Sequence, residues 1–125
     1  MKTFSKAWIK SKKPGKQRKY RANAPIHKKR KMMSGHLSRD LRKEHKKHAF
    51  PIRTDDKVKI LRGEFKGTIG KVERIDVKNM KIFVAGAERV KGEGQPASKY
   101  PIDPSNVKII TLELKDKKRK EALKR

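Results

Sequence analysis

The segment from Asp55 to Asp76 constrains the fold more than any other part of the chain. It opens with an alternating run in which Val58 and Ile60 share one face and lysines the other, which predicts a half-buried strand. A second strand is predicted from Thr68 onward. The two strands are separated by three glycines, Gly63, Gly67 and Gly70. This spacing predicts a hairpin whose backbone adopts positive φ or passes very close to another group.

The glycine hairpin has two interpretations from its spacing alone. Its backbone N–H groups, with Arg62 and Lys66 beside them, would form a small anion-binding surface, and in a basic chain the anion would be a phosphate. Alternatively, the glycines serve only a tight corner of a barrel that binds nothing there. Both interpretations require the same glycines.

The spacing also resembles the motif of the KOW family. KOW modules are small SH3-like barrels that bind RNA or ribonucleoprotein machines, so the resemblance implies that fold and that class of partner here. The matching residues are Val58, Ile60, Gly63, Lys66, Gly67, Gly70 and Val72.

Charge is distributed unevenly along the 125 residues, whose total net charge is +25. The first fifty residues carry eighteen Lys and Arg against Asp40 and Glu44, a net charge of +16. With 33% hydrophobic residues overall, the chain cannot bury a core along its whole length. We therefore expect a mainly β fold: a basic, partly helical extension over 1–50, an SH3-like barrel over 51–114, and a short, basic helical tail over 115–125.

The basic segment indicates a polyanionic partner, because an extended chain of this charge gains free energy by releasing counterions from nucleic acid. An anionic membrane is the weaker alternative. The longest apolar runs are too short for a transmembrane helix, the N-terminus lacks the apolar part of a secretory signal, and the chain has no cysteine. These features predict an intracellular, cytoplasmic protein.

Within residues 1–23, Pro14-Gly15 is expected to break the basic arm into two pieces. Phe4, Trp8 and Tyr20 alternate with cations, and they would either dock on a protein surface or stack on bases. A helix is expected over Ala24–Ser34, with Met33 and Leu37 continuing its apolar face.

A second short helix is expected after Ser38, a good N-cap, and it should end before Pro51. Further strands are predicted over 81–87 and 107–114, separated by a loop rich in glycine and proline. Four or five short strands in all would suit a small barrel.

Catalytic and metal sites are not predicted. His45 and His48 lie three apart, but Lys43, Lys46 and Lys47 crowd them and would oppose a divalent cation. Neither a Ser/His/Asp spacing nor a phosphate-binding loop occurs, so we expect no enzyme activity and no cofactor.

Nearly the whole chain resembles a ribosomal protein family. The runs GHLSRDLRKEH, FPIRTDDKVKILRGEFKGTIGKV and YPIDPSNVKIITLEL are similar to the archaeal form of the large-subunit L-twenty-four family, called L-twenty-six in eukaryotic counting. The resemblance implies binding to large-subunit rRNA, a role early in subunit assembly, a position near the polypeptide tunnel exit, neighbouring ribosomal proteins as partners, and no homo-oligomer. Asp103 departs from the family, in which relatives often carry His, and an acid there would repel phosphate.

We predict that RNA is recognised mainly by its shape and phosphates, because A-form grooves offer side chains little sequence information. The candidate RNA-binding residues are Trp8, Arg18, Tyr20, Arg21, His27, Lys28, Arg30, Lys31, Ser34, His36, Ser38, Arg39, Arg42, Arg53, Lys57, Arg62, Lys66 and Lys71. Two other functions share some features. A KOW-type transcription elongation factor would carry the hairpin, and a nucleic-acid-packaging protein would carry the charge.

Overall fold

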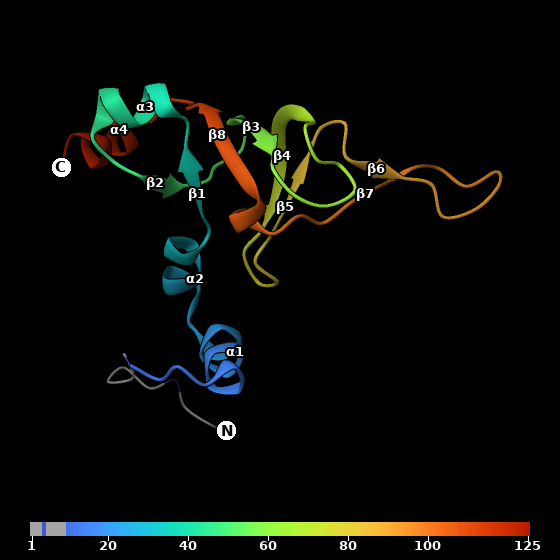
Figure 1. Cartoon of the computed structure of the whole chain (residues 1–125), viewed down its shortest axis with the longest axis horizontal. Helices are drawn as coiled ribbons and strands as arrows, with labels where there is room; N and C mark the ends of the chain where they lie inside the picture. The colour runs from blue at the N-terminus through green and yellow to red at the C-terminus, as the bar shows by residue number, and fades with distance from the viewer. Residues whose placement is uncertain (1–3, 5–9) are drawn as a thin grey trace.

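The computed structural model describes residue 4 and residues 10–125, and its centre is a six-stranded sheet (Figure 1). The strand order is β2-β1-β8-β3-β4-β5. The strands are β1 (Ser34–Leu37), β2 (Ala49–Pro51), β3 (Lys57–Ile60), β4 (Ile69–Asp76), β5 (Lys81–Val84) and β8 (Val107–Thr111). All neighbours are antiparallel except β1 and β8, which run parallel.

The sheet curls around a single apolar core. Val58 and Ile60 of β3 are buried while Lys57 and Lys59 are exposed, as their alternation predicted. The core also takes Leu37 from β1 and Ile109 from β8. β4 shifts register between Val72 and Arg74 as it passes from β3 to β5, and Ile82 of β5 bridges Ile102. The mainly β, small barrel-like fold is thereby confirmed.

Within the described residues, four α-helices lie at the ends of this sheet. They are α1 (Pro14–Asn23), α2 (Ile26–Met32), α3 (Arg39–His45) and α4 (Lys117–Lys124), and a 3-10 helix, η1 (Pro104–Asn106), precedes β8. In Figure 1, α3 and α4 lie together near one end of the sheet, whereas α1 and α2 lead away from it. A ribbon of β6 (Glu88–Arg89) and β7 (Ser98–Lys99) projects at the opposite end.

Two local predictions about the N-terminal half were wrong. Pro14 begins α1 instead of breaking the arm, because the first turn of a helix needs no proline N–H and favours its fixed φ. The helix expected over 24–34 ends at Met32, and Ser34–Leu37 form a strand. Met33 and Leu37 are both buried, but across a helix-to-strand junction. The division of the chain near residue 50 stays a prediction.

The C-terminal helix α4 is fixed to the barrel by a buried ion pair. The Arg119 guanidinium donates to both oxygens of Asp56 at 2.6 Å, and the two residues are 3% and 0% exposed. Asp56 also accepts the backbone N–H groups of Arg53 and Glu113 at 2.9 Å. Leu123 of the same helix joins the core, so the basic tail forms part of the fold.

Candidate nucleic-acid interface

Helix α1 presents charge without an apolar face. None of its ten residues is buried, and its first turn contains no acid. Lys16 and Lys19, like Arg18 and Arg21, lie three residues apart, where like charges destabilise a helix by roughly 0.2–0.5 kcal/mol per pair. At ten residues α1 is also shorter than helices that persist alone in water. A polyanion along this helix would remove the repulsion.

Helix α2 carries the next set of cations, and part of it faces a cavity of about 320 Å³. Arg30 and Lys31 from α2 and Arg53 from the chain after β2 line this cavity, beside the apolar side chains of Ile52 and Ile75. The structure therefore brings together three residues that sequence analysis proposed separately. His27 and Lys28 are exposed on the same helix.

Some proposed RNA contacts already have partners inside the protein. The Ser34 hydroxyl donates to the Lys31 carbonyl oxygen at 2.8 Å, and the Ser38 hydroxyl caps α3 by accepting the Leu41 N–H. Arg42 Nε donates to the Leu37 carbonyl oxygen at 2.9 Å. Each of these side chains stabilises the turn between two elements, which the sequence alone suggested only for Ser38.

Arg53 is also engaged, at the other side of the barrel. Its guanidinium lies 2.5 Å from the Asp116 carboxylate, which caps α4 through the Lys118 N–H. The hydrogen bond from Arg53 is the main reason that the pKa of Asp116 lies below its ordinary value. An RNA phosphate at Arg53 would compete with this carboxylate.

The outer face of the sheet carries a row of lysines, which we call the lysine face: Lys57, Lys59, Lys71 and Lys108. Lys57 pairs with Lys71 across β3 and β4, and Lys59 pairs with Lys108 across β3 and β8. Like charges directly opposite one another destabilise a sheet. Bound phosphates would compensate that cost.

Sequence analysis proposed Lys57 and Lys71 but missed the other two lysines of this face. Lys59 was assigned to the outward side of its strand, which was a sufficient signal to include it. Lys108 could not be found in that way, because its place opposite Lys59 depends on a strand almost fifty residues further along the chain. His36 pairs with Lys108 from β1 and extends the row.

The glycine hairpin is more closed to anions than its sequence indicated. Gly63 and Gly67 have φ values of +95° and +88°, and a Cβ at Gly70 would collide with the Ala85 carbonyl oxygen. The N–H groups of Lys66, Gly67 and Thr68 donate to carbonyl oxygens within the hairpin. The close approach at Gly70 is thus made to backbone, and anion contacts at the turn would fall to the exposed side chains of Arg62 and Lys66.

Two aromatic residues of the N-terminal arm were predicted to contact RNA, Trp8 and Tyr20. The Tyr20 ring lies 4.8 Å from that of Phe4 in a tilted arrangement, so this aromatic pair packs within the protein. Trp8 lies outside the described residues, and its role as an anchor stays a prediction.

Asp103 has a role that its charge alone did not suggest. It caps η1 by accepting the Ser105 N–H and hydroxyl, and it lies 3.6 Å from Lys81 and 4.0 Å from Arg21. Partial burial opposes its ionisation, but the Ser105 hydrogen bonds and the two cations outweigh this and lower its pKa. Asp103 therefore links α1 to the barrel.

Metal and membrane chemistry find no support in the described part of the chain. Its His, Asp and Glu residues form no group of three that could hold a metal ion. No helix there combines the length and apolar character needed to cross a bilayer.

The fold and this surface together define a class: a small, highly basic, barrel-like protein that presents cations to a polyanion from several elements. The chain belongs to the ribosomal protein family that is described as L26 in eukaryotes and, with the suffix P, as L24 in archaea, and the family model matches residues 11–125. It is similar to the "Large ribosomal subunit protein uL24" of Methanosphaera stadtmanae, with 46% identity over 92% of this chain and 97% of the relative. The protein of the same name from Korarchaeum cryptofilum is also 46% identical, over 94% of this chain and 88% of the relative.

Proposed function

We propose that this protein is a structural constituent of the large ribosomal subunit and binds rRNA through phosphate contacts. Its family and its relatives' names support the ribosomal role, and they support a binding protein in place of an enzyme. The observation that carries the RNA contact is the set of exposed cations on α1, α2 and the lysine face, which have few nearby carboxylates. Neutralising phosphates with these cations would release counterions and provide most of the affinity.

The finer parts of the proposal follow from the family resemblance. The protein would act in the cytoplasm, in the ribosome, would help an early step of subunit assembly near the polypeptide tunnel exit, and would contact neighbouring ribosomal proteins. Its contribution would be to hold two RNA segments in fixed positions, one along α1 and α2 and the other on the lysine face.

Competition between structured rRNA and duplex DNA at fixed salt tests this function against nucleic-acid packaging. We expect large-subunit rRNA to displace the protein from DNA much more effectively than DNA displaces it from rRNA, because cations spread over a folded surface match a folded RNA. Equal competition by DNA of the same phosphate concentration would support a packaging protein and contradict the proposal.

A matched pair of variants tests the lysine face. Lys57→Gln with Lys71→Gln removes two charges from the face, whereas Lys117→Gln with Lys120→Gln removes two exposed charges from α4. The first variant should weaken rRNA binding and make its salt dependence less steep, by roughly one released ion per lost phosphate contact. If both variants behave alike, net charge and not the lysine face determines the affinity.

A further inference from the structure

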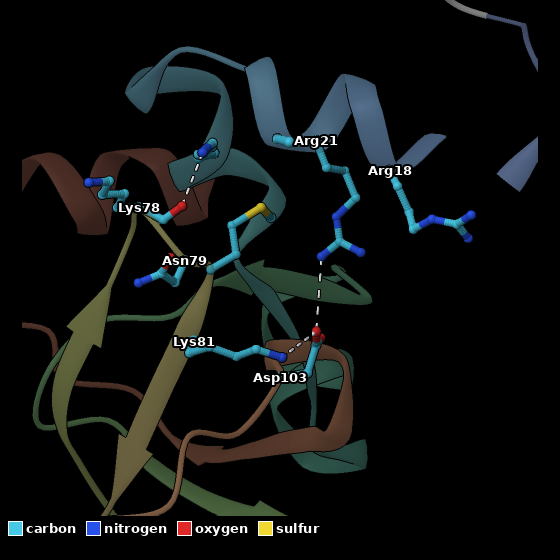
Figure 2. A pocket seen from close by; sticks show the side chains of 9 residues that line it. Arg18, Arg21, Lys78, Asn79, Lys81 and Asp103 are labelled. Atoms are coloured by element: carbon cyan, nitrogen blue, oxygen red, sulfur yellow. Dashed lines mark hydrogen bonds and ion pairs between the residues drawn. The ribbon is translucent and has the colours of Figure 1, made fainter. Parts of the chain in front are cut away.

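Two cavities meet beside helix α1, and both are lined by Lys81 and Asp103. The first, of about 330 Å³, lies between α1 and the turn that joins β4 to β5 (Figure 2). The second, of about 190 Å³, lies between the glycine hairpin and the segment from Tyr100 to Asn106. The shared residues make the two cavities parts of one groove.

The first cavity is strongly cationic. Arg18 and Arg21 from α1 face Lys78 and Lys81 from the β4–β5 hairpin, and Asp103 is the one carboxylate among the described residues that line it. Figure 2 shows Arg21 and Lys81 directed toward Asp103 while Arg18 points away from it. Within the described part of the chain, no carboxylate lies within ion-pair distance of Arg18 or Lys78. These two cations are available to phosphate oxygens.

The β4–β5 turn is held in place beside α2, which gives this cavity a defined shape. Lys29 of α2 donates from its ammonium group to the Lys78 carbonyl oxygen at 3.0 Å, and Figure 2 shows this bond. Asn79 in the same turn donates to the Asp76 carboxylate at 2.8 Å. The hydrogen bond from the Asn79 side chain is the main cause that lowers the pKa of Asp76.

The second cavity is aromatic and polar. The rings of Phe65 and Tyr100 lie 5.3 Å apart at 53°, and both line the cavity. Tyr100 is 36% exposed, which leaves part of the residue open to solvent. Arg62 and Asn106 line the same cavity and can offer hydrogen-bond donors to a base edge. An aromatic face beside such donors is the arrangement that proteins use to bind unstacked bases.

We propose that this groove binds a single-stranded segment of RNA, with its phosphates along Arg18 and Lys78 and an unstacked base against Tyr100. The inference rests on the proposed rRNA-binding function and specifies which form of RNA this part of the surface takes. A duplex keeps its bases stacked inside the helix, so it cannot place one against Tyr100. Asp103 holds Arg21 and Lys81 at the junction of the two cavities, where a carboxylate also disfavours a third phosphate.

The cavity sizes favour a polymer over a small ligand. Sites for small molecules commonly have volumes of roughly 300–1,000 Å³ and enclose most of the ligand. One cavity of the groove is at the lower limit of that range and the other is below it. Each is suited to one part of a longer chain, and a free mononucleotide should bind only weakly.

The test measures binding of the full chain to a fluorescent oligouridylate of about ten nucleotides and to an RNA duplex at the same salt concentration. Tyr100→Ala should weaken oligouridylate binding about 5- to 100-fold, the range found when one aromatic stacking partner of a base is removed, and leave duplex binding unchanged. Tyr100→Phe keeps the ring and should bind normally. Tyr100→Leu keeps an apolar contact with Phe65 and should fold, yet lose the same affinity as the alanine variant.

A second pair of variants tests the phosphate side of the groove. Lys78→Ala should reduce the salt dependence of oligouridylate binding by about 0.7 in the logarithmic slope, the value for one phosphate on a single strand. Lys120→Ala removes an equally exposed charge from α4 and should leave the slope unchanged. Ultraviolet crosslinking of the oligouridylate should label the segment around Tyr100.

Several results would overturn this inference. They are unchanged oligouridylate affinity in a folded Tyr100→Leu variant, equal losses for oligouridylate and duplex, or adenosine monophosphate binding as tightly as the oligomer. None of them would affect discrete binding to folded rRNA, which the competition experiment above measures separately. Failure of that experiment instead would remove the ribosomal function on which the groove depends.

Discussion

Replacement of Arg119 by methionine should destabilise the protein more than any change at a surface cation. The Arg119 guanidinium makes two bonds of 2.6 Å to Asp56 and further bonds to the carbonyl oxygens of Glu113 and Pro51 at 2.7 and 3.1 Å. Its charge also lies 5.5 Å from the centre of the Phe50 ring. Methionine would fill much of the same space but leave the Asp56 carboxylate buried and without its cation.

The expected cost is roughly 3–5 kcal/mol, the range for breaking one partner of a buried ion pair. A small domain has a total stability of about 5–15 kcal/mol, so the variant would lose a large fraction of it. Each kcal/mol corresponds to about 4–8 °C in Tm for a domain of this size, which predicts a fall of more than about 10 °C. Arg119→Lys keeps the charge but not the planar pair of bonds, and its stability should fall between those of the parent and Arg119→Met.

Urea unfolding followed by circular dichroism provides the measurement, with Lys120→Met as the control. Lys120 is the neighbouring residue on α4 and is exposed, so its replacement should change the unfolding free energy by less than about 0.5 kcal/mol. A loss below about 1 kcal/mol in Arg119→Met would refute the reasoning, because it would mean that α4 is not held by the Asp56 pair.

Three further predictions concern the hairpin, Asp103 and α1. Gly70→Ala should destabilise by several kcal/mol because its Cβ would collide with backbone, whereas Gly63→Ala, in open space at positive φ, should cost about 1 kcal/mol; urea unfolding of both compares them, and equal costs would contradict the close approach. The Asp103 carboxyl should titrate below its ordinary pKa of 3.8, so its stabilisation is present above that pH and is lost as the pH falls through the lower, folded value; NMR titration with a midpoint at or above 3.8 would disprove it. Helicity should rise on rRNA binding as phosphates relieve repulsion along α1, and circular dichroism showing no gain would refute that.

The barrel strands were predictable because their signals are local. Alternating burial in β3 and the glycine spacing before β4 each follow from the residues within one hairpin. The strand β1 was missed because the four-residue spacing of Met33 and Leu37 fits a helix as well as a helix-to-strand junction. What decides between them is parallel pairing with β8, and Leu37 pairs with Ile109, more than seventy residues away.

The candidate site was predictable as a composition but not as an arrangement. Excess Lys and Arg in the N-terminal half indicated nucleic acid, and many of those residues are indeed exposed. The groove beside α1 was not visible, because Lys78, Lys81 and Tyr100 come from elements that meet only in the folded chain. The buried role of Asp56 was hidden for the same reason, since its partner Arg119 lies sixty-three residues further on.

Footprinting on purified large-subunit rRNA tests the central claim most directly, with the full chain compared with a variant that lacks residues 1–23. Removal of residues 1–50 would be less informative, since it would delete β1 and most of β2 from the sheet. We predict protection at discrete rRNA sites by the full chain, and persistence of a subset, contacted by α2 and the lysine face, in the shortened variant. Diffuse protection that disappears with residues 1–23 would contradict the account, because charge in the arm alone would then explain the binding.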